Sequence, residues 1–172
     1  KTKLNRYADK LMSYPNYVGT IQSFIDQYVT KPYLKNITKN SIQVVDDVTY
    51  ANYFYNLLWS DRRRTSQYHS LRYFIKFQVE NGSNKFSSQV DYIQNLYFSN
   101  DELFVRGKNK AKEEKKSDSA RQYIQAKESL LKEEGIITYS DAYKYATEAI
   151  SNLSSEYTDL FSQRFQYVFV DE

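Results

Sequence analysis

An apolar run followed by two carboxylates closes the sequence, as Arg164-Phe-Gln-Tyr-Val-Phe-Val-Asp-Glu172. Residues 167–170 are aromatic or β-branched without interruption, which predicts a buried strand. Asp171 and Glu172 then follow at the carboxyl end of that strand, where open α/β sheets bind their ligands. A carboxylate pair in that position can hold Mg²⁺ and activate a water against a phosphate. The alternative reading of the same pattern is an ordinary surface strand that ends in two acidic residues.

The composition allows a packed core and excludes several kinds of chemistry. The chain has 172 residues, enough for one domain or one domain with an appendage, and 41% of them are hydrophobic. Its net charge of +3, from 24 basic and 21 acidic side chains, permits nucleic-acid binding without arguing for it. Cysteine is absent, which excludes disulfides and cysteine-based zinc sites and fits a cytoplasmic protein. No apolar run approaches the roughly 20 residues of a membrane span, so we expect no membrane partner.

Helical periodicity dominates the chain. Apolar residues recur every three or four positions, with Asp or Ser residues where helices would begin. Pro32 is expected to end the second helix, and Gly135 suits the position directly after the fourth. The predicted helices cover residues 4–12, 23–29 or beyond, from 46 or 47 to about 59, from 118 or 119 to 134, from 140 or 141 to 150, and 157–161. The side chains expected to face the core include Tyr50, Phe54, Leu57, Leu58, Ala142, Tyr145, Ala146 and Ile150.

Short segments between the helices predict strands. Residues 17–21 contain a glycine, which lets another backbone approach closely. Residues 41–45 form a second short apolar run, and 104–105 a third. With a closing strand at 166–171, the fold class is mainly α with a small β component (α+β), in which strands at 17–21 and 166–171 flank a helical block.

A β-hairpin is predicted near residues 71–90. Residues 71–79 are rich in aromatic and β-branched side chains, Asn81-Gly82 is a strong turn signal, and 86–90 can return as the partner strand. Residues 92–103, which follow the hairpin, fit a helix or a strand equally well, and 136–138 form a short link.

Three segments carry short motifs. The first is Gly19-Thr-Ile-Gln-Ser-Phe24, the second is Glu134-Gly-Ile-Ile-Thr-Tyr-Ser-Asp-Ala142, and the third is Arg164 to Glu172. In this order and at this spacing they resemble the superfamily 1 helicases of the UvrD/Rep type. In that family the counterpart of the first segment faces single-stranded DNA and that of the second leads into the last helices before motif II. The third segment is similar to the start of motif II, the Walker B strand.

The resemblance implies a domain organisation. Residues 1–34 would be a remnant of core domain 1A of a RecA-like fold, and 164–172 its Walker B strand. Residues 35–163 would be a helix-rich insertion similar to the family's subdomain 1B. Because the sequence has no initiator Met and stops on Asp-Glu, we expect it to be an internal piece of a longer chain. Terminal strands without their sheet neighbours would then leave edges through which copies can associate.

The resemblance also implies roles for particular residues. Asp171 would hold Mg²⁺, and Glu172 would be the catalytic base that orients the attacking water on ATP. Thr20, Gln22 and Ser23 would face the DNA strand. The family usually has His where this chain has Gln22; glutamine keeps a donor and an acceptor but cannot titrate.

A basic run suggests a second DNA contact from the residues themselves. Arg62, Arg63 and Arg64 stand between Trp59 and Tyr68. Arginines can grip phosphates while a neighbouring aromatic ring stacks on a base. The alternative is a solvated basic turn with Trp59 in the core.

The intact protein would be an ATP-dependent DNA helicase that translocates on single-stranded DNA and unwinds duplex in repair, recombination or defence. ATP and Mg²⁺ would be its cofactors. The 172 residues contain no Gly-x-x-x-x-Gly-Lys-Ser/Thr phosphate loop, so this chain alone should not hydrolyse ATP. Two alternatives stay open: a non-catalytic helical interaction module, or part of a different P-loop ATPase or helicase–nuclease.

Overall fold

The computed structural model describes residues 16–59, 66–82, 86–99, 102–106, 118–152 and 155–165. The described chain is mainly helical with a few short strands, which confirms the α+β class. The predicted helix at 4–12 and the closing strand at 166–171 lie outside the described residues.

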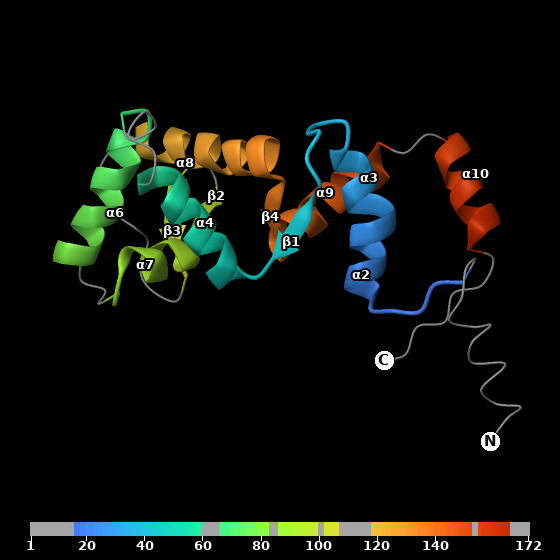
Figure 1. Ribbon diagram of the computed structural model, residues 1–172, viewed down its shortest axis with the longest axis horizontal. Helices are drawn as coiled ribbons and strands as arrows, with labels where there is room; N and C mark the ends of the chain where they lie inside the picture. Colours follow the sequence, from blue (N-terminus) through green and yellow to red (C-terminus); the bar gives the residue numbers. More distant parts are fainter. Residues whose placement is uncertain are drawn as a thin grey trace, which may run out of the picture. The chain divides into compact units, whose positions relative to one another are not determined.

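The chain forms two compact units (Figure 1). We call the first the terminal unit, because it combines Lys1–Leu34 with Ala142–Glu172. The second, the central unit, is the continuous stretch Lys35–Asp141. The predicted insertion at 35–163 and the central unit begin at the same residue. They end differently, because residues 142–163 group with the two ends of the chain instead.

The terminal unit contains one continuous helical run made of three parts. These are α2 (Ile21–Ile25), the π-helical turn η1 (Asp26–Thr30) and α3 (Lys31–Leu34). The expectation that Pro32 ends this helix is wrong, since the run continues to Leu34. Proline has no N–H to donate and crowds the carbonyl four residues earlier. A wider π turn directly before it is one of the local adjustments that let a helix continue.

The strand predicted at 17–21 is also wrong. Residues 16–20 form no strand, and α2 begins at Ile21. Thr20 has an extended backbone and serves as the N-cap of α2. The other helices that the structure describes in this unit are α9 (Tyr139–Ser151), from Ala142 onward, and α10 (Ser155–Arg164). The predicted short helix at 157–161 lies within α10 and is confirmed.

Helix α9 buries a narrow stripe of alanines. Ala142, Ala146 and Ala149 are buried at helical spacing. The expectation that Ile150 faces inward is wrong, because its side chain is 58% exposed. Ile150 follows the last alanine of the stripe by one position, which turns it about 100° away from the buried face.

In the described ranges of the central unit, two small sheets accompany four helices that pack together. Strand β1 (Gln43–Val45) pairs in parallel with β4 (Ile136–Thr138), and Val44 lies opposite Ile137. Strands β2 (Leu96–Ser99) and β3 (Glu102–Val105) form an antiparallel pair. Helix α4 packs against α7 and α8, and α6 packs against the same two helices (Figure 1). The helices are α4 (Asp47–Trp59), α6 (His69–Asn81), α7 (Gln89–Asn95) and α8 (Asp118–Ser129), which continues into η2 (Leu130–Glu134).

The core of this unit lies between those helices. Tyr50, Phe54, Leu57 and Leu58 are all buried, so the predicted inward face of α4 is confirmed. Tyr123 is buried as well, and its hydroxyl donates to the Leu96 carbonyl at 3.1 Å. Burial raises the pKa of Tyr123. Asp46 caps α4 as predicted, accepting from the N–H groups of Val48 and Thr49. The backbone and side-chain hydrogen bonds from Thr49 lower the pKa of Asp46.

The β-hairpin predicted near 71–90 is wrong. Residues 69–81 form helix α6, with Leu71 and Ile75 buried one turn apart. Tyr73 and Phe77 lie on the exposed side, 65% and 47% exposed. These residues form a helix despite their β-branched and aromatic composition, because tertiary packing outweighs local strand propensity. Asn81-Gly82 ends this helix rather than turning a hairpin: the Gly82 N–H donates to the Gln78 carbonyl at 2.9 Å.

Gly135 ends η2 in the left-handed conformation, as its predicted position after the helix requires (φ 72°). A loop from the start of the central unit covers the same helix end. Thr38 Oγ1 donates to the Lys132 carbonyl at 2.9 Å, and Asn40 Nδ2 donates to the Glu133 carbonyl at 2.6 Å. The predicted link at 136–138 is the buried strand β4.

Candidate nucleic-acid interface

The Gly19–Phe24 segment forms the first turn of α2. Thr20 Oγ1 accepts from the Ser23 N–H at 3.1 Å, and Ser23 Oγ donates to the Thr20 carbonyl at 2.9 Å. Both residues are exposed. The two hydroxyls predicted to face DNA therefore also build the helix cap, which is a common use of Thr and Ser at this position.

Gln22 lies half-buried on the same turn, and its side chain hydrogen-bonds a residue of the next turn. Its side-chain Nε2 donates to Asp26 Oδ1 at 2.8 Å. Asp26 is buried in η1, with 9% of its surface exposed. The pair is separated by four positions, which places both side chains on one helix face. Sequence reasoning missed Asp26, although this spacing was a usable signal.

Tyr17 is a second residue that sequence reasoning missed. Its hydroxyl hydrogen-bonds Ser23 Oγ. The ring also explains Gly19: a Cβ there would lie 2.5 Å from the Tyr17 hydroxyl oxygen. Glycine thus makes room for a side chain rather than for the neighbouring backbone that the strand prediction assumed.

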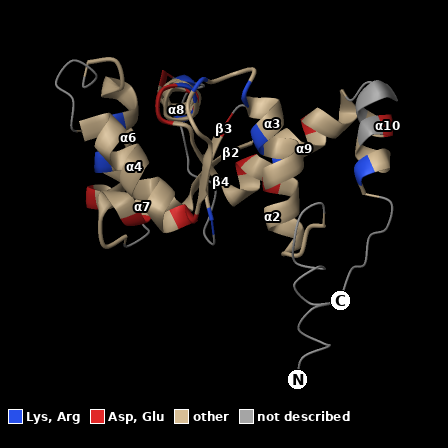
Figure 2. Ribbon diagram, turned by 45° about the vertical axis from the view of Figure 1, so that its right-hand side comes forward, with Lys and Arg blue, Asp and Glu red and all other residues tan. Residues whose placement is uncertain are grey.

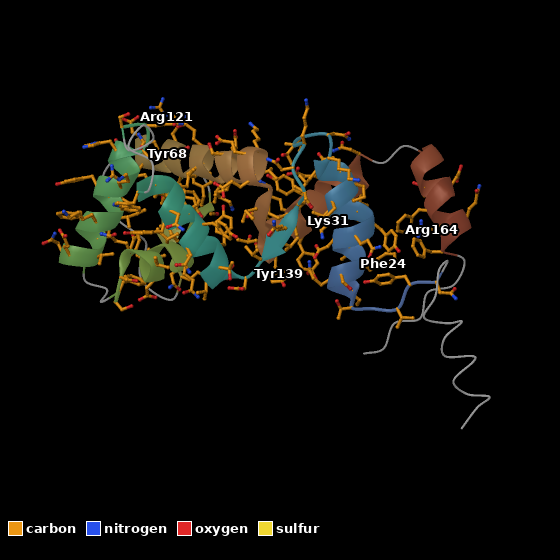
Figure 3. The ribbon with its side chains drawn as sticks, viewed as in Figure 1. Phe24, Lys31, Tyr68, Arg121, Tyr139 and Arg164 are labelled. Atoms are coloured by element: carbon orange, nitrogen blue, oxygen red, sulfur yellow. The ribbon has the colours of Figure 1, made fainter. Side chains whose placement is uncertain are left out.

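Aromatic rings join the first and last motif segments. We call Tyr17, Phe24, Tyr28, Phe161 and Phe165 the aromatic cluster. The Phe24 ring centroid lies 5.0 Å from that of Phe165 and 5.7 Å from that of Phe161, both edge to face. This arrangement is among the favourable geometries for aromatic pairs. Figure 3 labels Phe24 on α2 and Arg164 at the end of α10. The cluster therefore brings the Gly19–Phe24 segment against the start of the Arg164–Glu172 segment.

Arg164 adds a positive charge to this cluster. Its guanidinium carbon lies 5.0 Å from the Tyr28 ring centroid and 5.4 Å from that of Phe165. These distances fit cation–π contacts. The side chain is exposed, so a fixed positive charge lies at the surface of the terminal unit, close to the Gly19–Phe24 turn.

The second motif segment, Glu134–Ala142, belongs to the central unit as far as Asp141, and there it has a structural role. Thr138 and Asp141 form a capping box at the start of α9. The Asp141 N–H donates to Thr138 Oγ1 at 3.1 Å, and Asp141 Oδ2 accepts from the Thr138 N–H at 3.5 Å and from Thr138 Oγ1 at 2.8 Å. Lys127 Nζ from α8 lies 2.6 Å from Asp141 Oδ1. This segment thus anchors the start of α9.

The surroundings of the basic run differ from the prediction. Arg62, Arg63 and Arg64 lie outside the described residues. Tyr68 is only 1% exposed and its hydroxyl hydrogen-bonds Ser129 Oγ, so the expectation that Tyr68 stacks on a base is wrong. Trp59 is stacked on Tyr55 with centroids 4.7 Å apart and packs against the core. Those rings are used for packing, and the arginines alone remain as candidates for phosphate contact.

Charges of both signs are mixed on the described helices of the central unit (Figure 2). Lys76 pairs with Glu80 on α6, and Arg121 pairs with Asp118 on α8. Such exposed pairs contribute little to stability. They do dilute the positive field that a phosphate backbone would meet on these two helices.

Asp171 and Glu172 lie outside the described residues, so their roles stay predictions. Among the residues that the structure describes, no three His, Asp or Glu side chains gather as a metal site. No helix in the same ranges is long and apolar enough to cross a membrane. Comparisons with protein-family models, curated protein sequences and solved structures found no match.

Replacing Phe24 by Ala should unfold the terminal unit at lower temperature than the wild type. Phe24 contacts four other rings of the aromatic cluster. Because it is half-buried, we expect a loss of about 2–3 kcal/mol, at or below the lower end for a buried Phe. Thermal unfolding followed by circular dichroism measures this.

The matched control is Ile21→Ala on the same helix. Ile21 is 58% exposed, so its truncation should change stability by less than about 0.5 kcal/mol. Equal losses for the two variants would show that the cluster does not hold the two segments together.

Proposed function

We propose that this chain is part of an ATP-dependent DNA helicase of the UvrD/Rep type. The observation that supports the proposal best is the packing of Phe24 on Phe165, with ring centroids 5.0 Å apart. These residues belong to the two segments that resemble the family's DNA-facing segment and its Walker B strand. They lie at opposite ends of the chain, yet one cluster of rings joins them.

This packing suits a motor. A helicase must couple the state of its nucleotide to its grip on a DNA strand. Rigid, contiguous packing is a physical means of transmitting such a change. In the proposal, the Gly19–Phe24 turn holds the strand, and Phe165 continues into the segment that ends on Asp171 and Glu172. A shift at the nucleotide would reach the DNA contact through the aromatic cluster.

The proposed roles follow the resemblance. Asp171 holds Mg²⁺ and Glu172 orients the water that attacks ATP. Thr20, Gln22 and Ser23 contact the strand. The phosphate loop belongs to a part of the intact protein outside these 172 residues. The central unit serves as the 1B-like block that guides duplex or strand near the fork, and the protein acts in the cytoplasm.

The intact protein tests this function. On forked, 3′-tailed and 5′-tailed duplexes, it should hydrolyse ATP faster when single-stranded DNA is present and should separate the strands. The 172-residue chain serves as the control: it should bind single-stranded DNA without hydrolysing ATP. ATP hydrolysis that ignores DNA would favour a different P-loop ATPase. Absence of hydrolysis and DNA binding from the intact protein would favour an interaction module.

Changing Arg62, Arg63 and Arg64 together to Ala should weaken DNA binding and flatten its salt dependence. Each lost contact with a single-stranded phosphate should reduce the slope of log K against log salt by about 0.7. Binding titrations at several salt concentrations measure the slope. As a control for net charge, Lys35, Lys39 and Lys144 are exposed and can be changed to Ala together. The same slope in the arginine variant and the wild type would identify the run as a solvated turn.

A further inference from the structure

Asp26 is a buried acidic residue to which the proposed function gives no role. It lies in the π-helical turn η1 with 9% of its surface exposed. A carboxylate at such a site needs hydrogen bonds to offset the water that it loses. The side chain of Gln22 supplies one, from Nε2 at 2.8 Å. Gln22 in turn belongs to the segment proposed to meet the DNA strand.

The pair fixes which end of the Gln22 amide can meet a ligand. A carboxylate only accepts hydrogen bonds, so Asp26 selects the NH₂ end of the amide and excludes the carbonyl end. The Gln22 Oε1 atom is then turned away from Asp26. No hydrogen bond to Oε1 is found among the residues that the structure describes. Gln22 therefore presents an acceptor.

An acceptor at this position favours bases over phosphates. Phosphate oxygens are themselves acceptors, so they repel Oε1. A phosphate that approached the second Nε2 proton would also come close to the negative charge of Asp26. Every nucleobase carries at least one N–H donor, and unstacked bases in single strands offer these edges to side chains. An amide held in this way can serve strands of any sequence.

We propose that Asp26 is a positioning residue that holds Gln22 as an acceptor for the base edges of a single strand. This inference rests on the proposed DNA contact of the Gly19–Phe24 segment and adds what that contact recognises. Thr20 and Ser23 are left to meet the sugar–phosphate backbone. Asp26 itself does not touch the DNA.

The test compares two DNA strands of equal length in fluorescence anisotropy titrations of the 172-residue chain. One is an oligothymidylate, and the other carries abasic tetrahydrofuran sites throughout. Both have the same phosphates, but only the first has bases. The variants are Asp26→Asn, which nearly preserves the shape of the side chain, Gln22→Leu, and the double variant.

Gln22→Leu should bind oligothymidylate about threefold to tenfold more weakly, as expected for the loss of one hydrogen bond. Asp26→Asn should also bind it more weakly than the wild type, but no more weakly than Gln22→Leu, because Asn offers both an acceptor and a donor and no longer selects one end of the Gln22 amide. The affinity of both single variants for the abasic strand should equal that of the wild type. The double variant should bind no more weakly than Gln22→Leu, because the two residues act on one contact. Circular dichroism spectra check that each variant is folded, and Gln22→Leu keeps the test valid if Asp26→Asn is not.

The other outcomes overturn the inference in recognisable ways. Equal weakening on both strands would assign Asp26 a purely structural role, and unchanged affinity on both would assign it none in binding. A wild-type chain that binds both strands equally would refute base recognition while leaving the DNA contact in place. A wild-type chain that binds neither strand would refute the proposed DNA contact of this segment, and this inference with it.

Discussion

Replacing Gly135 by Ala is expected to destabilise the central unit by about 2–5 kcal/mol. Two costs add up. Gly135 has φ 72°, and a side chain in the left-handed region costs roughly 1–2 kcal/mol. An added Cβ would also lie 2.4 Å from the Ser41 carbonyl oxygen, a backbone atom that cannot rotate away. Relieving that overlap has a cost like that of overpacking, roughly 1–3 kcal/mol. Chemical denaturation followed by circular dichroism measures the loss.

Two further variants separate these costs. Gly135→Asn should recover only the conformational part, because Asn tolerates the left-handed region but still carries a Cβ. Glu134→Ala changes the exposed neighbour on η2 and should shift stability by less than about 0.5 kcal/mol. If Gly135→Ala were as stable as Glu134→Ala, the Ser41 carbonyl would not pack closely against Gly135 at this helix end.

Changing Glu172 to Gln in the intact protein is expected to abolish ATP turnover while ATP still binds. Glutamine has nearly the shape of glutamate but cannot take a proton from the attacking water. Removing a general base of this kind lowers rates by about 10²–10⁴-fold. A phosphate-release assay measures turnover, and a fluorescent ATP analogue measures binding.

The carboxylate next to it provides the comparison. Asp171→Asn should raise the Mg²⁺ concentration that the reaction needs and should lower its rate, because Asp171 is proposed to hold the metal. Unchanged phosphate release by Glu172→Gln would refute the role given to Glu172. Loss of ATP binding in the same variant would mean that this residue holds the nucleotide rather than activating water.

Local signals predicted those parts of the fold that depend on neighbouring residues. Asp46 caps α4 through the N–H groups two and three positions further along the sequence, and the spacing of Tyr50, Phe54 and Leu57 alone places them on one face. Gly135 was recognisable because few other residues accept its conformation. In each case the physical cause lies within a few positions of the residue concerned.

The failures share a different cause. Residues 71–79 have the composition of a strand, but the packing of Leu71 and Ile75 on other helices selects α6. A similar limit applies to the candidate interface. The Gln22–Asp26 pair was within reach of sequence spacing, whereas the contact of Phe24 with Phe165 was not. No sequence periodicity links residues at opposite ends of a chain, so the contact between Phe24 and Phe165 is visible only in the three-dimensional structure.

The pairing of β1 with β4 brings the two ends of the central unit together, as in a domain inserted into another chain. β1 lies near the first residue of the unit and β4 near its last, and the two strands run side by side in parallel. The chain therefore starts and finishes this unit at neighbouring points. Whatever lies between them can be lengthened, trimmed or exchanged without pulling the flanking segments apart, because the distance to be bridged stays the same. A protein built in this way can change the sequence and size of its central unit while the sequence of its terminal unit stays unchanged.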